Sequence, residues 1–304
     1  MKRYSLTIGI PAYNEEANIQ NLLDSIFNQQ MNSVHLESII LVCDGCTDNT
    51  IKILRFLNIK YKILHIITSN KRTGKAAALN KIYRMSQSDF LLTMDADVIF
   101  EGIHNLEHMA KRLIKNPKLN MVGPDHIPTK TNTLFGNFSR ISGITIREAV
   151  AKFNNGNNFY SCMAAEFMKR EFYKSFTFPK NTLSDQCYVY GKSIEKSLSG
   201  YEFVPQAKVI FGVAQTFHDW RVSSVRSTVG DKADAIHHFG AKILPLYTIP
   251  KKIYFLTLLK WFIKSPIYSL GSIIMNIYIR VFPYKKPQNI SVWEVVKSSK
   301  YISV

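Results

Sequence analysis

The chain has 304 residues, with 39 Lys and Arg against 22 Asp and Glu, a formal net charge of +17 and 46% hydrophobic residues. This length and composition exclude an intrinsically disordered chain and predict a folded protein with a large core. The positive charge indicates an anionic partner, such as nucleic acid, an acidic membrane surface or a phosphorylated substrate. Four cysteines are too few for a disulfide framework in a chain of this length, which favours a reducing compartment.

The first part of the chain alternates between strand and helix patterns. Its start leads directly into an apolar strand over 5–10, without the long apolar segment of a signal peptide. Further strands are predicted over 38–43, 62–67, 89–94 and 119–122, and helices from about residue 14 and over 48–57, 74–85 and 103–115. This alternation predicts an α/β fold with a mostly parallel, Rossmann-like central sheet and helices on both faces.

Turn-forming and acidic residues stand where three of these strands end. Pro11-Ala12-Tyr13 follows the first strand, Asp44-Gly45 the second, and Asp95-Ala96-Asp97 the strand over 89–94. Ligand sites of open α/β sheets lie at the carboxyl ends of the strands. We therefore expect these three segments to converge on one site.

Asp95 and Asp97 form a candidate metal site. Two carboxylates separated by one small residue supply the hard oxygen ligands that Mg²⁺ or Mn²⁺ prefers, and a diphosphate can complete the coordination. The alternative is a chance Asp-x-Asp turn in which an Asp caps the next helix. A zinc or redox role for the pair Cys43 and Cys46 is disfavoured because the chain has no second Cys-x-x-Cys.

Four segments of this region together resemble the motifs of family 2 glycosyltransferases, inverting enzymes with the GT-A fold. They are Ile8–Glu16, Val42–Thr50, Gly74–Asn80 and Met94–Asp97, and they occur in the family's order over about residues 5–100. The resemblance implies a GT-A fold, a nucleotide sugar as donor, with UDP as the expected nucleotide, and a divalent metal cofactor, Mn²⁺ or Mg²⁺.

The resemblance also assigns roles to single residues. The backbone of 11–13 and the carboxylate of Glu15 would hold the base and ribose, and Asp44 would accept hydrogen bonds from uracil or ribose. Lys75 would lie near the base or the phosphates as a charged donor. Asp95 and Asp97 would bind the metal that neutralises the leaving diphosphate, which also places Asp95 at the nucleotide sugar. The alternatives are a simple turn at Asp44 and a solvated helix lysine at Lys75.

The middle of the chain is looser over 124–158, as in a mobile active-site loop followed by a helix over 138–153. Helices are then expected over 166–176 and 184–199, and a strand over 201–211. Asp185 matches the family's catalytic base, which accepts the proton of the acceptor hydroxyl, although Ser184 replaces the usual Glu. Its alternative role is a helix N-cap or first-turn acid.

Two further residues are candidates by the resemblance alone. Arg226 falls where relatives carry a basic residue that grips the pyrophosphate. His218 is a candidate third metal ligand, with a structural histidine as the alternative. A Gln-x-x-Arg-Trp signature is absent from the sequence, so chain polymerisation is not expected.

The last fifth is basic and apolar. Between Asp234 and Glu294 there is no acidic residue, and the longest charge-free run, 265–279, falls short of the roughly 20 residues of a spanning helix. Three interpretations stay open: a helical subdomain packed on the core, amphipathic helices in a membrane interface, and a true span. The interface is favoured because basic residues are interspersed among aromatic ones. The basic residues are Lys242, Lys251, Lys252, Lys260, Lys264, Arg280, Lys285 and Lys286.

We therefore expect a GT-A domain over 1–234, with a nucleotide-sugar half (1–123) and an acceptor half (124–234), and a membrane-associating, amphipathic helical appendage over 235–304. The expected activity is metal-dependent transfer of a sugar, with inversion, to a glycan or lipid-linked acceptor in cell-surface polysaccharide or lipid-linked glycan synthesis. The expected location is cytoplasmic, peripheral on the inner face of the cell membrane, at an anionic surface.

Two alternative functions are less well supported. A nucleotidyltransferase would need a glycine-rich triphosphate loop near the amino terminus, which this chain lacks. An inactive nucleotide-sugar-binding module would not need Asp44, Asp95, Asp97 and Asp185 together. No nucleic-acid recognition motif is found.

Overall fold

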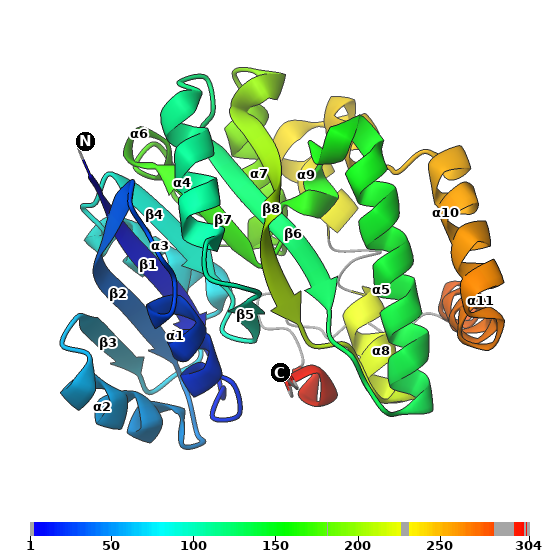
Figure 1. Cartoon of the computed structure of the whole chain (residues 1–304), viewed down its shortest axis with the longest axis horizontal. Coiled ribbons are helices and arrows are strands. Elements are labelled where there is room, and N and C mark those ends of the chain that lie inside the picture. The colour runs from blue at the N-terminus through cyan, green and yellow to red at the C-terminus, as the bar shows by residue number, and fades with distance from the viewer. Residues whose placement is uncertain (1–2, 181, 226–230, 283–294, 301, 303–304) are drawn as a thin grey trace.

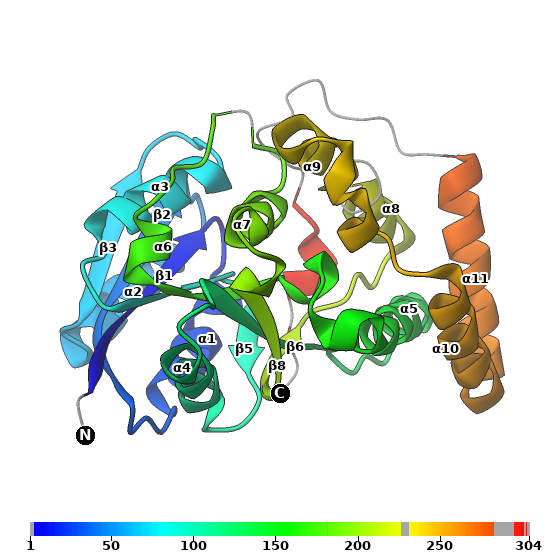
Figure 2. The same cartoon turned by 90° about the horizontal axis from the view of Figure 1, so that it is seen from above.

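The computed structural model describes residues 3–180, 182–225, 231–282, 295–300 and 302. Within these residues one eight-stranded sheet, ordered β3-β2-β1-β4-β7-β6-β8-β5, has helices on both faces (Figures 1 and 2), which confirms the expected α/β class. The strands are β1 (Tyr4–Ala12), β2 (Val34–Asp44), β3 (Leu64–Ser69), β4 (Phe90–Met94), β5 (Val98–Phe100), β6 (Met121–Pro128), β7 (Ala165–Lys169) and β8 (Tyr201–Phe211).

The helices follow the strands in the order that the sequence predicts for the first half. They are α1 (Ile19–Phe27), α2 (Thr50–Lys60), α3 (Lys75–Met85), α4 (Asn105–Lys115), α5 (Leu134–Lys152), α6 (Arg170–Tyr173), α7 (Asp185–Ile194), α8 (Phe217–Val225), α9 (Asp231–Phe239), α10 (Lys251–Lys264) and α11 (Pro266–Val281). Short 3-10 helices are η1 (Phe153–Gly156), η2 (Phe159–Ser161), η3 (Leu198–Gly200), η5 (Ala241–Tyr247) and η6 (Lys297–Lys300). Figure 2 shows α1 and α4 on one face of the sheet and α3 and α7 on the other.

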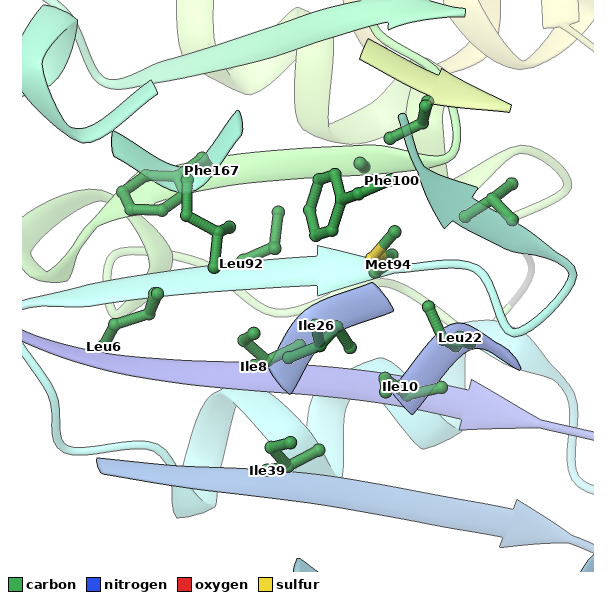
Figure 3. Close-up of a cluster of buried hydrophobic side chains, with 14 of the residues drawn as sticks. Leu6, Ile8, Ile10, Leu22, Ile26, Ile39, Leu92, Met94, Phe100 and Phe167 are labelled. Atoms are coloured by element: carbon green, nitrogen blue, oxygen red, sulfur yellow. The ribbon is translucent and has the colours of Figure 1, made fainter. Parts of the chain in front are cut away.

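Strands β3, β2, β1 and β4 are all parallel. Such strands are buried on both faces, which explains their nearly continuous apolar sequences. On one face Ile8 and Ile10 pack with Leu22 and Ile26 of α1 (Figure 3). On the other face α3 lies so close to β1 that a Cβ at Gly9 would come 2.2 Å from a side-chain carbon of α3.

The second half of the sheet is mixed. β7 runs antiparallel to both β4 and β6, β8 runs parallel to β6, and β5 pairs antiparallel with β8. The mostly parallel sheet predicted from the sequence therefore describes the part from β3 to β4, and the part that follows carries two reversed strands. The three-residue strand β5 was not predicted because it is shorter than any periodic pattern can reveal.

The helix expected over 166–176 is wrong for its first part. Residues 165–169 form β7, which is paired on both sides, and only Arg170–Tyr173 are helical. Phe167 and Met168 point to the two opposite core clusters, as neighbours in a strand do. Pairing with β4 and β6 overrides the local helical preference of this segment.

Other boundaries in this half also differ from those expected. β6 continues to Pro128, where a loop was expected, and α5 begins at Leu134, before residue 138. α7 begins at Asp185 but ends at Ile194, short of residue 199, and η3 follows it. The strand over 201–211 has its predicted bounds.

The carboxy-terminal helices α10 and α11 pack beside α5, as both cartoon views show (Figures 1 and 2). Small and apolar side chains face the protein, including Thr257, Ser269, Ser272 and Met275. In the part of the chain that the structure describes, no helix combines the length and hydropathy needed to cross a bilayer. The boundary near residue 234 stays a prediction.

Candidate active site

A cavity of about 1580 Å³ opens where the carboxyl ends of β1, β2 and β4 meet. Its wall also includes the first residues of α3 and α7, and on the far side residues of α5, α8 and α11. The structure brings nine of the predicted residues together along this cavity: Pro11, Ala12, Tyr13, Glu15, Asp44, Lys75, Asp95, Asp97 and Asp185.

Lys75 stands between the predicted metal ligand and the predicted base. Its Nζ lies 2.5 Å from Oδ1 of Asp95 and 2.8 Å from Oδ2 of Asp185. Burial disfavours the charged lysine, but the attraction of Asp185 and Asp95 outweighs it and raises the pKa of Lys75 above its ordinary value. One ammonium group therefore links α3, the metal motif and α7.

Asp95 is held by its backbone as well as by Lys75. Its N–H donates to the carbonyl of Ala164 (2.8 Å), a residue with the unusual φ of 56°, and Nε2 of Gln186 donates to its Oδ2 at 3.4 Å. Burial raises the pKa of Asp95 to about 6; Lys75 opposes this shift, and Asp97 reinforces it. Asp95 and Asp97 therefore repel each other, and a divalent cation bound between them would reduce this repulsion.

Glu166 is a buried acid that lies behind this site. Oγ1 of Thr93 donates to its Oε2 at 2.8 Å, while its Oε1 is buried and has no hydrogen-bond partner among the described residues. Burial raises the pKa of Glu166 to about 8, against the attraction of Lys75. Sequence analysis placed Glu166 in a helix, whereas the residue lies in β7.

The described residues contain no group of three His, Cys, Asp or Glu side chains that could hold a metal ion by themselves. Asp95 and Asp97 nevertheless fit Mn²⁺ or Mg²⁺ with a diphosphate as further ligand, because they offer paired carboxylate oxygens with a raised proton affinity at Asp95. His218 lies exposed on α8 and is not among the described residues that line the cavity. Arg226 lies outside the described residues. Both assignments stay predictions.

Asp44 binds the turn that leads into α3. Its Oδ2 accepts hydrogen bonds from the N–H groups of Thr73 (2.8 Å) and Gly74 (2.7 Å), and its Oδ1 accepts one from the Thr73 hydroxyl. Gly74 has φ +98°, a conformation that favours glycine. Asp44 thus fixes the turn from which Lys75 enters the cavity, and its contact with a base stays a prediction.

The segment after β1 forms another part of the cavity wall. The guanidinium of Arg72 lies 4.0 Å from the ring centre of Tyr13, a cation–π contact. Glu15 is buried, and Nζ of Lys300 lies 2.6 Å from its Oε1. Burial raises the pKa of Glu15 to about 7, with a further contribution from Asp97 and opposition from Lys300. Sequence analysis missed Arg72 and Lys300, and Lys300 carries no local signal that could have identified it.

The cavity wall formed by β6 and α5 carries a different charged group. Arg147 of α5 makes a two-pronged ion pair with Asp125, with Nε 2.7 Å from Oδ1 and a second N–H bound to Oδ2 at 2.5 Å. Next to it, Nε2 of His126 contacts the carbonyl of Met163, and burial lowers the pKa of His126 to about 4. At neutral pH this wall therefore presents one neutral imidazole and one paired Arg.

The sequence and the fold of this chain are each similar to those of known proteins. The sequence model of the family described as Glycosyl transferase family 2 matches residues 7–175. The poly-beta-1,6-N-acetyl-D-glucosamine synthase of Staphylococcus epidermidis is 28% identical over 126 residues, 41% of this chain and 29% of that protein. The 4,4'-diaponeurosporenoate glycosyltransferase of Staphylococcus haemolyticus is 35% identical over 104 residues, 34% of this chain and 27% of that protein. The chain thus spans less than a third of the curated relatives that it matches.

Two solved structures share the fold over most of their length. A mannosyltransferase of Pyrobaculum calidifontis, determined with GDP-mannose and Mn²⁺, aligns with a TM-score of 0.54 at 17% identity and covers 91% of this chain and 88% of its own. S. aureus TarS (residues 1–349), determined with UDP, aligns with a TM-score of 0.50 at 13% identity and covers 93% of each chain. These likenesses confirm the GT-A fold.

Proposed function

Because this chain belongs to glycosyl transferase family 2, we propose that it transfers a hexosyl group from a nucleoside diphosphate sugar to an acceptor hydroxyl, with inversion at the anomeric carbon. The proposed donor is a UDP-sugar. The proposed acceptor is a glycan or a lipid-linked molecule of cell-surface polysaccharide or lipid-linked glycan synthesis.

The observation that carries this proposal is the link between Asp95 and Asp185 through Lys75. It means that the proposed metal-binding carboxylate, Asp95, and a carboxylate at the start of a separate helix, Asp185, face the same cavity. A donor diphosphate near Asp95 and an acceptor hydroxyl near Asp185 would therefore lie close together. Neither a nucleotidyltransferase nor a binding module without activity requires this second carboxylate.

In the proposed reaction the acceptor oxygen bonds to the anomeric carbon as the bond from that carbon to the diphosphate breaks. Asp185 accepts the proton of the hydroxyl, which makes it the general base. Lys75 holds Asp185 in place and donates to an anionic phosphate. Asp95 and Asp97 would hold Mn²⁺ or Mg²⁺, which supplies positive charge to the departing diphosphate when it is bound.

Relatives support the choice of donor and acceptor. TarS is described with UDP, whereas the mannosyltransferase is described with GDP-mannose, so UDP has to be tested against GDP. A further relative from Proteus mirabilis, 30% identical over 94 residues, is described as an undecaprenyl-phosphate 4-deoxy-4-formamido-L-arabinose transferase. Its printed name supports a lipid-linked acceptor for the present chain.

The first test is the release of nucleotide from a panel of UDP- and GDP-sugars with Mn²⁺, Mg²⁺ or EDTA. We expect slow release from one UDP-sugar, its loss in EDTA, and a reduction of roughly hundredfold or more in Asp97→Asn. Asp24→Asn on α1, away from the cavity, is the control. If calorimetry detects neither UDP nor GDP binding, the proposed function is wrong.

We also propose that α10 and α11 bring the protein to the inner face of an anionic membrane. Their outward side chains are unusually apolar: Phe255 is 62% exposed, Ile263 74% and Ile267 73%. No acidic residue lies between Asp234 and Glu294, while Lys251, Lys252 and Lys264 flank the apolar side chains. Large exposed apolar areas with basic neighbours are typical of interfacial helices.

Sedimentation with lipid vesicles tests this part separately. We expect binding to vesicles that contain an anionic lipid and weaker binding to vesicles of neutral lipid or at high salt. The double variant Phe255→Ser/Ile263→Ser should lose binding, whereas Phe56→Ser on α2, a residue that is 74% exposed, should keep it. Equal sedimentation of both variants would contradict the proposal.

A further inference from the structure

The carboxy-terminal segment reaches the wall of the cavity beside the first strand. Val295, Val296, Ser299 and Lys300 all line the cavity. In Figure 1 this segment, coloured red, lies at the lower centre of the molecule. It is far along the chain from β1, yet Nζ of Lys300 lies 2.9 Å from the carbonyl oxygen of Tyr13, the residue that follows β1. The segment is therefore part of the site that the first hundred residues build.

Three fixed contacts hold the segment there. The N–H of Ser298 donates to Asp219 of α8 at 2.8 Å, and the N–H of Gln215 donates to the Ser298 hydroxyl at 2.9 Å. The carbonyl of Ser299 lies so close to Gly212 that a Cβ there would come within 1.7 Å of it. Only glycine leaves room for this approach.

Apolar anchors stand on both sides of Lys300. Val296 is buried in a cluster with Trp220 and Met275, and Ile302 is buried in the main core cluster. Because Val296 and Ile302 are both buried, the backbone at Lys300 is held in place and its side chain stays close to the cavity wall. Its side chain is only 15% exposed.

All three donor positions of the Lys300 ammonium meet an acceptor. Nζ donates to the carbonyls of Tyr13 (2.9 Å) and Asn14 (2.6 Å) and to Oε1 of Glu15 (2.6 Å). Asn14 has a φ of 53°, which turns the chain sharply after β1. Tyr13 and Glu15 of this segment are predicted to hold the nucleoside, and the part-buried carbonyls of Tyr13 and Asn14 need a donor to keep one arrangement.

We infer that Lys300 is a positioning residue of the donor site, which holds segment 13–15 in the conformation that receives the nucleoside of the donor. This inference rests on the proposed function, since it concerns the same site. Lys300 does not replace the nucleotide, because its ammonium is satisfied by the backbone and carboxylate of the segment and leaves the Tyr13 ring and the Asp95–Asp97 pair facing the cavity.

The experiment is calorimetric titration of the full chain with UDP in the presence of Mn²⁺, for the wild type, Lys300→Met, Lys300→Arg and Lys297→Met. Lys297 lies exposed in the same η6 helix and is the matched control. We expect Lys300→Met to bind UDP roughly tenfold to a hundredfold more weakly, as for the loss of a charge-assisted hydrogen-bond network. Lys300→Arg, which keeps the charge, should recover most of the affinity, and Lys297→Met should equal the wild type.

Turnover measurements add a readout that general loss of structure would not give. With the donor sugar found in the first test, Lys300→Met should raise the donor KM by the same factor and change kcat by less than about threefold. Thermal unfolding of each variant shows whether the fold is kept. Equal UDP affinity in a folded Lys300→Met protein overturns the inference, and so does tighter binding, which would identify the segment as a competitor of the nucleotide. If the wild type does not bind UDP or GDP, it is the proposed function that fails.

Discussion

The Nζ atom of Lys75 lies 2.8 Å from Oδ2 of Asp185, so that the first residue of α3 is bonded to the first residue of α7. The two helices come from the two halves of the chain. Because the same ammonium group also meets Asp95, the position of α7 depends on the turn that carries the metal motif. The proposed general base and the proposed metal ligand are therefore placed by one cation, and a change at any of the three residues should affect the other two.

Asp185→Asn should lower kcat by roughly 10²–10⁴-fold, because an amide cannot accept the proton of the acceptor hydroxyl. UDP binding should stay near the wild-type value, since the amide oxygen can still accept a hydrogen bond from Lys75. The measurement pairs steady-state turnover with calorimetry. Glu195→Gln, an exposed residue just after α7, is the control. A kcat within tenfold of the wild type would exclude Asp185 as the base.

Glu166→Gln should change the pH dependence of stability. The pKa of Glu166 rises from the ordinary 4.5 to about 8 in the folded protein. Between these values the unfolded chain releases the proton and the folded protein keeps it, so this group lowers the stability of the metal-free protein as pH rises from about 4.5 to about 8. The penalty is complete above about 8 and absent below about 4.5.

The glutamine variant lacks this penalty. Its stability relative to the wild type should therefore increase across the same window, by a total on the order of a few kcal/mol. Urea unfolding at several pH values measures the difference. A difference that is constant with pH would show that Glu166 does not hold its proton in the folded state.

Asp44→Ala should destabilise the protein by about 1–3 kcal/mol, because two N–H groups in the turn before α3 and the Thr73 hydroxyl lose their acceptor. Asp44→Asn keeps one acceptor oxygen and should lie between the wild type and Asp44→Ala. Urea unfolding gives the order. Equal stability of all three proteins would mean that water replaces the Asp44 carboxylate as the acceptor at no cost in stability.

Arg147→Ala should cost about 2 kcal/mol or more, because it leaves the buried carboxylate of Asp125 without its partner. Adding Asp125→Asn to this variant should recover part of the loss, since the uncompensated charge is then removed. Unfolding of the two single variants and the double variant completes a double-mutant cycle. Additive effects would show that the ion pair contributes nothing beyond its separate residues.

Local patterns in the sequence were enough for the first half of the fold. Buried parallel strands are short apolar runs in the sequence, and the residues at their carboxyl ends carry the ligand chemistry. The convergence of Tyr13, Asp44 and Asp95 therefore followed from the alternation of strands and helices. A helix start at residue 184 was also predicted. The helix begins one residue later, at Asp185, and Ser184 is its N-cap, whose hydroxyl accepts the N–H of Cys187.

Other features depended on partners far along the chain. Residues 165–169 become a strand only because β4 and β6 offer edges on both sides, which no local pattern reports. The outward apolar face of α10 and α11 could be predicted as amphipathic, but its inner contact with α5 could not.

The sequence by itself indicated the family through the resemblance of its four motifs. It also determined the parallel half of the sheet and the acids at its edge, since hydrophobic period and strand-end chemistry are properties of neighbouring residues. Only the tertiary structure decided that Lys75 joins Asp95 to Asp185 and that Lys300 holds the segment after β1. The physical reason is that the position of a lysine in the sequence does not reveal which groups its ammonium will contact. Its partners are set by which helix ends and loops the packed core brings within hydrogen-bond distance.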